Sequence, residues 1–410
     1  MFLTKRKTDR LISLIDCNLI KESVMPFYHH LGHLPHKRHT QFRQPDGTLY
    51  REQLIGTKGF SGIQSILYHC HQPTQIKHAE TLGSAGVQYV EDGALRHRLF
   101  RSKDAPLGGD PLTARRVLMG NANVTMAVAR PTESMPYHYR NGEAHELYWV
   151  HAGEGTLHSQ YGSLDFGPGD YLNIPISTTW RMELKGAGHR FLVFESARDF
   201  EFPHRYRNEY GQLLENSPFC ERDLRLPDRL ETHDELGDFE VRVKARGEFH
   251  RHILDHHPLD VIGWDGYLYP YAFNIYDFEP ITGRVHQPPP VHQTFEGWDF
   301  VICSFMPRLF DYHPLSIPAP YNHANVNSDE VLYYAEGNFM SRKGVEQMDI
   351  SLHPGGLPHG PHPGTIEASL GKERTEEVAV MMDTFHPLHV TPFALECEDE
   401  RYAYSWVEHK

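Results

Sequence analysis

The sequence has few cysteines, no long apolar run and no excess of positive charge. Its five cysteines are scattered, odd in number and never spaced as Cys-x-x-Cys, which favours a reduced, cytoplasmic protein over a disulfide-stabilised secreted one. No apolar run approaches the roughly 18 residues of a membrane-spanning helix. The 40 Lys and Arg against 54 Asp and Glu give a net charge of −14, which argues against nucleic acid or an anionic membrane as partner. The cysteines are Cys17, Cys70, Cys220, Cys303 and Cys397.

Helical periodicity is also scarce. From Met25 onward, short β-rich runs alternate with turn residues, and a helical pattern is hard to find outside residues 208–214. The 33 Gly and 29 Pro suit a chain with many tight turns, and 410 residues are enough for more than one core. We therefore expect an all-β fold.

Residues 1–24 differ from the rest of the chain. They combine a basic run at 5–7 with a short apolar stretch at 11–20 that polar residues interrupt. A secretory signal needs an uninterrupted apolar segment and a small-residue cleavage site, and neither is found here. We expect an N-terminal extension, and leave open whether it is a tail, an added helix or a segment before a natural start at Met25.

An internal repeat organises the remainder. Residues 146–153 and 330–337 each have a Glu, an alternating apolar and aromatic strand, and a Gly seven residues after the Glu. A second pair of segments, 167–175 and 353–359, each carry a Pro-Gly turn and reach a Pro 29 and 28 residues after those glutamates. Chance recurrence is the alternative, but two coinciding patterns favour two jelly-roll barrels, a bicupin-like fold.

This repeat predicts three parts of the chain. They are an N-terminal extension at 1–24, an N-terminal β-domain at 25–270 with a degenerate barrel at about 118–200, and a C-terminal catalytic domain at 271–410.

The second repeat carries a candidate metal site. His323 and Glu330, with His359 on the returning segment, are two imidazoles and one carboxylate that a barrel would bring together. This set is typical of Fe(II) oxygenases, in which the remaining metal positions accept a substrate and O2. Zinc more often has a tetrahedral site, and no cysteine ligand stands here. We therefore expect the C-terminal barrel to hold Fe(II).

The spacing of the first two ligands raises one difficulty. His323 and Glu330 are seven residues apart, and an odd separation places two side chains on opposite faces of a regular strand. Either a loop or bulge before the glutamate resets the face, or Asp329 is the ligand. The register of the repeat favours Glu330.

The first repeat lacks the complete set. It has His138, His145 and Glu146, but no histidine follows Pro175 where the third ligand would stand. We expect this barrel to be structural, with its histidines hydrogen-bonded or exposed.

Four further histidines surround the predicted site. His286 and His292 flank a run of prolines, which stiffens an extended loop. His353 and His362 lie near the last ligand. A histidine beside the metal can remove a phenolic proton, because its unperturbed pKa is about 6.5. A surface position is the alternative for each.

At these residues the chain resembles homogentisate 1,2-dioxygenase, in a shorter bacterial-type branch. The resemblance is strongest in the last third and thin between residues 74 and 117. The matching segments are 25–28, 50–54, 262–271, 321–323, 328–330, 351–353 and 358–361.

The resemblance implies roles for individual residues. Fe(II) would be bound by His323, Glu330 and His359. The base would be His286, with His292 as runner-up. His353 and Tyr321 would line the substrate pocket, with His359 beside them. One extra residue before the glutamate, and Phe339 in place of a pocket tyrosine, depart from the longer branch and put the ring substituents of the substrate in doubt.

The resemblance also implies an activity. The enzyme would convert homogentisate and O2 to maleylacetoacetate in tyrosine and phenylalanine catabolism, as a cytoplasmic homo-oligomer, a trimer or hexamer. Alternatives are a cupin dioxygenase acting on gentisate or a substituted hydroquinone, a non-catalytic ligand-binding bicupin, or an isomerase using zinc or manganese.

Overall fold

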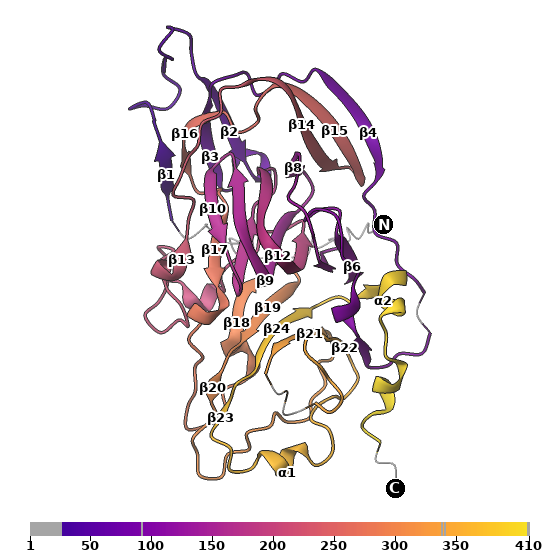
Figure 1. The fold of residues 1–410 in the computed structure, drawn as a ribbon. Coiled ribbons are helices and arrows are strands. Elements are labelled where there is room, and N and C mark those ends of the chain that lie inside the picture. The colour runs from indigo at the N-terminus through magenta and orange to yellow at the C-terminus, as the bar shows by residue number, and fades with distance from the viewer. Residues whose placement is uncertain (1–26, 92, 338, 340–341, 408–410) are drawn as a thin grey trace, which may run out of the picture.

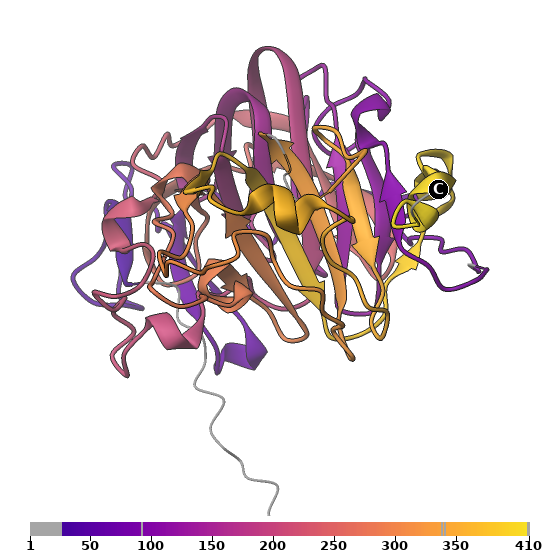
Figure 2. The same ribbon diagram turned by 90° about the horizontal axis from the view of Figure 1, so that it is seen from below.

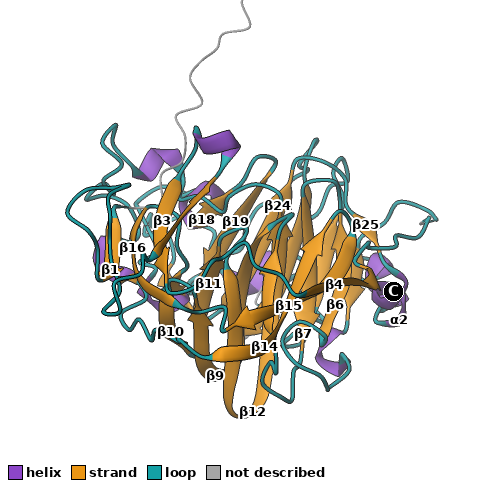
Figure 3. Ribbon diagram, turned by 90° about the horizontal axis from the view of Figure 1, so that it is seen from above, coloured by secondary structure: helices purple, strands orange, loops and turns teal. Residues whose placement is uncertain are grey.

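The computed structural model describes residues 27–91, 93–337, 339 and 342–407, so the expected extension at 1–24 and Met25 lie outside the described residues (Figure 1). Strands dominate the described chain, and its α-helices are α1 (Thr365–Ser369) and α2 (Pro392–Glu396), of five residues each (Figure 3). The expectation of an all-β, bicupin-like fold is confirmed. No helix in this part of the chain is long and apolar enough to cross a membrane.

The larger sheet has 13 strands and occupies the upper part of Figure 1. Its long strands β9 (His145–Ser159) and β12 (Thr179–Ser196) pair antiparallel over most of their length. The other strands are β4 (His78–Ser84), β6 (Arg115–Gly120), β7 (Val124–Ala129), β8 (His138–Asn141), β10 (Gly162–Phe166), β11 (Asp170–Ile174), β13 (Leu224–Arg225), β14 (Leu236–Ala245), β15 (Glu248–His256), β17 (Tyr271–Asn274) and β25 (His389–Val390).

A second sheet of six strands lies below it, with α1 at its lower end (Figures 1 and 2). Its order is β18 (Gln293–Glu296), β19 (Phe300–Phe305), β24 (Val378–Thr384), β21 (Asp329–Glu336), β22 (Ile350–His353) and β5 (Arg98–Phe100). Two smaller sheets complete the fold. They are β1 (His29–Gly32), β16 (Val261–Gly266), β3 (Gln64–His69) and β2 (Arg51–Gly56), and the pair β20 (Arg308–Leu309) and β23 (Arg374–Thr375).

The two large sheets exchange strands. β5, from the first quarter of the chain, closes the edge of the second sheet against β22, while β25, near the C-terminus, pairs with β6 of the first. β17 also pairs with β11, so the first sheet extends four residues past the predicted boundary at 270/271. The two units are thus joined by backbone hydrogen bonds as well as by packing.

On one face of the repeated strands β9 and β21, side chains pack in a core that the two barrels share. On the other face, they pack inside the strand's own barrel. Leu147 and Trp149 of β9 belong to the same buried cluster as Val331 and Tyr333 of β21. Tyr148, between them on β9, points into a separate cluster in the first barrel. Both faces of the strand are therefore buried. This explains why its sequence is a continuous apolar run although successive side chains point to opposite faces.

The glycines of the repeat have equivalent conformations. Gly153 and Gly337 have φ values of +90° and +99°, a region that disfavours residues with a Cβ. A Cβ at Gly153 would lie 2.3 Å from the His189 ring, and one at Gly337 would lie 2.7 Å from the Glu376 carbonyl oxygen. Gly153 lies within β9, where its pairing with β12 shifts register, and Gly337 directly follows the last residue of β21. The matching glycines therefore share a backbone conformation at the same distance from the glutamate.

Candidate metal centre

A short backbone bridge brings the two candidate histidine ligands together. His323 and His359 exchange two hydrogen bonds, each N–H donating to the other residue's carbonyl at 2.8 Å. Their ring centroids lie 4.2 Å apart. The bridge lies outside the regular strands, so residues 36 positions apart in sequence present their imidazoles side by side.

Glu330 on β21 completes the group. Its Oε2 lies 3.5 Å from Nε2 of His323 and 3.5 Å from Nε2 of His359. The three ligand atoms all lie within 4.8 Å of one another, close enough to share one cation. The three residues predicted from sequence to bind metal are therefore brought together.

In both imidazoles, Nδ1 lies next to a backbone carbonyl and Nε2 faces the carboxylate of Glu330. Nδ1 of His323 lies 3.2 Å from the Tyr321 carbonyl, and Nδ1 of His359 lies 3.1 Å from the Leu357 carbonyl. Each Nδ1–H can donate to its carbonyl, which leaves Nε2 as a lone-pair donor. The buried Nε2 of His359 has no hydrogen-bond partner among the described residues. This donor set fits a divalent cation.

Asp329, the alternative carboxylate ligand, points elsewhere. Its Oδ1 accepts a hydrogen bond from Gly355 N at 2.7 Å, and its Oδ2 accepts one from Leu388 N at 2.8 Å. The strand β21 begins only at Asp329, so the chain between His323 and the strand is irregular. A loop thus resets the face, as the odd spacing required, and leaves Glu330 as the candidate ligand.

His353 lies behind the carboxylate rather than in the substrate cavity predicted for it. It is opposite Glu330 on β22, and its Nδ1 lies 2.8 Å from Glu330 Oε1. Its Nε2 lies 3.1 Å from the hydroxyl of Tyr402. Burial lowers the pKa of His353 to about 3, so the ring is neutral and can donate from Nδ1 while accepting from Tyr402. It therefore orients the carboxylate.

The carboxylate itself stays ionised. Burial alone would raise the pKa of Glu330, but its contacts with His323, His353 and His359 hold it well below its ordinary value. The neutral ring of His353 adds no positive charge beside this buried anion.

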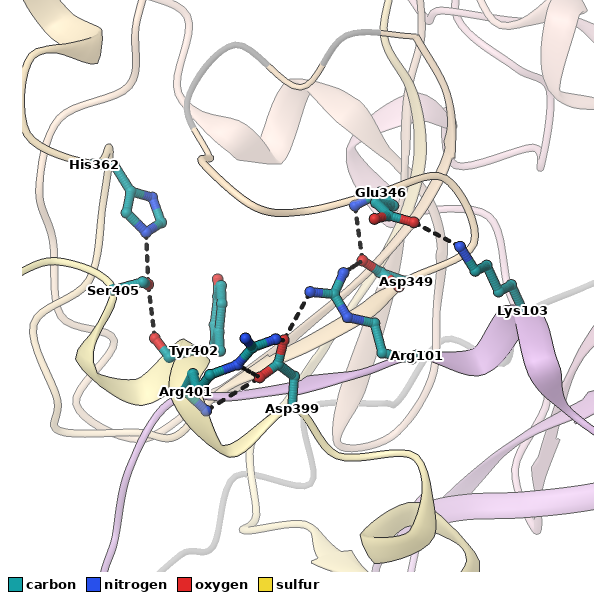
Figure 4. A network of polar contacts seen from close by, with 9 residues as sticks. All are labelled: Arg101, Lys103, Glu346, Asp349, His362, Asp399, Arg401, Tyr402 and Ser405. Atoms are coloured by element: carbon teal, nitrogen blue, oxygen red, sulfur yellow. Dashed lines mark hydrogen bonds and ion pairs between the residues drawn. The ribbon is translucent and has the colours of Figure 1, made fainter.

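The C-terminal segment reaches the site through Tyr402 and forms polar contacts with His362 (Figure 4). His362 Nε2 lies 2.8 Å from the Ser405 hydroxyl, which donates to the Tyr402 carbonyl at 2.7 Å. Trp406 stacks on His362 with ring centroids 4.2 Å apart. His362 is therefore held in a buried packing position away from the cavity.

Ion pairs fasten this segment to the second sheet. Arg101 contacts Asp349, beside β22, and lies 2.8 Å from Asp399 at the start of the C-terminal segment (Figure 4). Asp399 also binds Arg401 at 3.1 Å. Sequence analysis missed Tyr402 and its supports, because no motif or spacing relates them to the histidines.

A cavity of about 190 Å³ opens beside the candidate ligands. His286 lines it with its side chain half exposed, and its Nδ1 lies 3.2 Å from Asp311 Oδ2. His292 also lines it but is buried, with its ring 4.5 Å from that of Phe305. Burial, with the nearby Arg308, lowers the pKa of His292 to about 3. The two candidate bases therefore have different environments.

Tyr321 lines the same cavity between a candidate base and a ligand. Its ring centroid lies 5.1 Å from that of His286 and 5.8 Å from that of His323. Phe339, also in the lining, packs edge-on against Tyr334 at 4.7 Å. Two lining arginines, Arg308 and Arg342, were not predicted, because a single arginine in a loop-rich segment carries no sequence signal.

The first barrel places its carboxylate differently. Glu146 is buried and binds Arg115 at 2.6 Å. His145 pairs instead with Asp199 at 2.7 Å, and His138 packs against His257 with centroids 5.0 Å apart. A second possible metal-binding group among the described residues consists of Glu201, His204 and Glu296, near the junction of the two units.

Comparisons with known proteins identify dioxygenases among the relatives of this chain. A sequence profile described as homogentisate 1,2-dioxygenase N-terminal matches residues 117–275. A candidate dioxygenase of Saccharolobus solfataricus is 43% identical over 385 residues, which cover 93% of this chain and 99% of that protein. The homogentisate 1,2-dioxygenases of Bradyrhizobium diazoefficiens and Nitrobacter hamburgensis are 27% and 26% identical. Those matches cover 67% and 66% of this chain but 64% and 62% of the relatives, less than two thirds of their length.

Solved structures give weaker similarities. Oxalate decarboxylase of Bacillus subtilis is 12% identical with a TM-score of 0.34, covering 73% of this chain and 81% of that one. A cupin 2 conserved barrel domain protein from Leptotrichia buccalis is 8% identical with a TM-score of 0.32, covering 72% and 98%.

Proposed function

Because the chain belongs to the homogentisate 1,2-dioxygenase family, we propose that it is an Fe(II)-dependent dioxygenase that cleaves the ring of homogentisate to give maleylacetoacetate. The observation that carries the proposal is the convergence of two imidazole Nε2 atoms and one carboxylate beside a cavity. This donor set suits Fe(II) and leaves metal positions open. His323, Glu330 and His359 would hold the ion, which when bound supplies the redox chemistry with O2 that ring cleavage needs.

His286 is the proposed base. Asp311 accepts a hydrogen bond from its Nδ1–H, which leaves Nε2 to accept the proton of a substrate hydroxyl. Asp311 also stabilises the imidazolium that forms. His292 is a poorer proton acceptor, since its pKa of about 3 lies far below neutrality.

The cavity walls position the ring and exclude water. Tyr321 lies between the base and the candidate ligand His323, where it can contact the substrate ring. The edge-on pair of Tyr334 and Phe339 provides an apolar surface on another part of the lining. An aromatic substrate buried among these side chains gains apolar contact area.

We also propose a cytoplasmic homo-oligomer, a trimer or hexamer. All seven residues of β4, at the end of the larger sheet's strand order, are exposed. An exposed edge strand of this length favours association with another chain.

The test is anaerobic reconstitution with Fe(II), followed by addition of homogentisate and air. We expect oxygen uptake and a yellow ring-opened diketo acid in the absorbance spectrum. Uptake with gentisate or a substituted hydroquinone, but none with homogentisate, would contradict the substrate assignment. Activity in a preparation with stoichiometric zinc and no iron would contradict the dioxygenase assignment.

A further inference from the structure

We infer that the cavity contains an anion subsite, formed by Arg308 and His292, which binds the carboxylate of an aromatic acid while its ring hydroxyls face the candidate ligands. The inference rests on the proposed function and identifies which side chains select the acid. It assigns the substrate carboxylate to protein donors instead of to the metal.

Arg308 is a cavity-lining cation that forms no ion pair among the described residues, although Glu377 and Asp311 are near enough to raise its pKa against the effect of burial. It lies on the short strand β20, and its side chain is partly buried. Its one hydrogen bond among the described residues runs from Nη1 to the Met306 carbonyl at 3.2 Å, and no described carboxylate lies within ion-pair distance. Burial lowers its pKa below the ordinary value. A buried guanidinium with unused donors is costly unless a ligand anion pairs with it.

His292 provides a neutral polar group next to this cation. It is 5% exposed, and its buried Nδ1 has no hydrogen-bond partner among the described residues. Phe305 joins the two residues, because its ring lies 4.5 Å from the His292 ring and 5.5 Å from the Arg308 guanidinium carbon. A charged donor, a neutral donor and an aromatic wall are thus adjacent, which suits a carboxylate attached to a ring.

The formal charges of the cavity favour a monoanion. Arg308 and Arg342 line it together with Glu330, Asp311 and Glu377. With a divalent cation bound, the two arginines and the cation carry four positive charges, and the three carboxylates carry three negative charges. One positive charge remains, and one substrate carboxylate would neutralise it.

The other arginine is already engaged. Arg342 donates to the Gly360 carbonyl and lies 5.9 Å from the Trp406 ring centroid, so it supports the C-terminal segment. By contrast, no hydrogen bond, ring contact or ion pair joins Arg308 or His292 to the three candidate ligands in the described part of the chain. The subsite is therefore separate from the metal group, and metal positions stay free for a ring oxygen and O2.

The test compares homogentisate with its neutral carboxamide by calorimetry. Binding is measured to the metal-free protein and to the Zn(II)-loaded protein, which has no redox chemistry. A charge-assisted hydrogen bond predicts that the acid binds roughly 10- to 100-fold more tightly than the amide. If Arg308 holds the carboxylate, this preference is present in both forms. A preference found only in the Zn(II)-loaded protein overturns the inference, since the metal would then bind the carboxylate.

Arg308→Gln provides the second measurement, with Arg374→Gln as matched control. Arg374 lies on β23, paired with β20, and is exposed beside Glu376. We expect Arg308→Gln to lose the preference for the acid, and Arg308→Lys and Arg374→Gln to retain it. Retention in Arg308→Gln overturns the inference. If Arg308→Gln does not fold, the metal-free wild-type measurement still decides.

The inference and the proposed function can fail separately. Turnover of homogentisate without any acid preference in the metal-free protein keeps the function and removes the subsite. An acid preference with turnover of gentisate alone keeps the subsite and removes the substrate assignment. A wild-type protein that binds neither compound contradicts both.

Discussion

Each barrel has a glutamate at the equivalent position of an equivalent strand, and different side chains surround the two carboxylates. Glu146 of β9 lies opposite Glu195 of β12, while Glu330 of β21 lies opposite Asp383 of β24. In the first barrel, Arg115 contacts both glutamates. In the second barrel, neutral or weakly basic histidines surround Glu330. In the first barrel, an arginine of the chain thus pairs with the glutamate. In the second barrel, a bound metal ion would take the place of that arginine.

The acidic neighbours differ as well. Lys244 contacts Glu195, and Arg115 with Lys244 holds the pKa of Glu195 below its ordinary value against the effect of burial, while burial raises the pKa of Glu146. Burial and the nearby charge of Glu330 raise the pKa of Asp383 to about 8, so Asp383 is protonated at neutral pH and adds no second negative charge. A single charged carboxylate contacted by imidazoles, with no arginine or lysine in ion-pair contact among the described residues, distinguishes the candidate metal centre from the first barrel.

The largest expected effect is the loss of metal on changing Glu330. Glu330→Gln removes the only formal charge of the ligand set, so Fe(II) binding and turnover should fall to background. Metal content after anaerobic reconstitution and gel filtration measures this. The matched control is Glu146→Gln in the first barrel, which should keep one equivalent of iron. Stoichiometric iron in Glu330→Gln would show that the ion binds elsewhere.

The control variant carries its own prediction. Glu146→Gln should lower the free energy of unfolding by about 1.5–3 kcal/mol, because a charge-assisted hydrogen bond to buried Arg115 is lost while Glu195 remains as a partner. Urea unfolding of the metal-free protein measures the change. A stability equal to that of the wild type would mean that the first-barrel ion pair is not structural.

A smaller effect is expected from the residue behind the carboxylate. His353→Gln should weaken metal binding roughly 10- to 100-fold, because Glu330 would lose the neighbour that orients it. Competition with a metal chelator gives the affinity. His145→Gln, in the first barrel, should leave it unchanged. Equal affinities for both variants would contradict an orienting role for His353.

The smallest expected effect is the pH dependence of fold stability and metal affinity. A hydrogen bond with Glu330 raises the pKa of His323 above its ordinary 6.5. In the metal-free protein, the resulting ion pair stabilises the fold fully below pH 6.5 and its contribution is lost as pH rises through the raised pKa. Metal must displace this proton, so its affinity should rise up to about tenfold per pH unit around the raised pKa, then level off. Titrations that show no pH dependence would contradict this.

Local patterns predicted the repeat and the three residues that come together at the candidate metal centre. The Glu and Gly spacing located equivalent strand segments, since strand alternation and the backbone conformation of a glycine depend on neighbouring residues. The bridge between His323 and His359, and the irregular segment before Asp329, explain how an odd spacing still yields one site.

Contacts between residues far apart in the sequence could not be predicted from such local patterns. The family resemblance placed His353 in the substrate pocket, but strand pairing turns it toward Glu330 and Tyr402. The exchange of β5 and β25 between the sheets depends on chain segments more than 200 residues apart, and the position of Arg308 in the cavity depends on several separate segments between residues 281 and 381. No local periodicity encodes them.

The most direct measurement is an anomalous difference map at the iron edge from crystals of the protein reconstituted with Fe(II). We predict one peak within bonding distance of Nε2 of His323, Nε2 of His359 and the carboxylate of Glu330. A peak at Glu201, His204 and Glu296 instead, with none between the two histidines, would contradict the assignment of the second barrel as the metal centre.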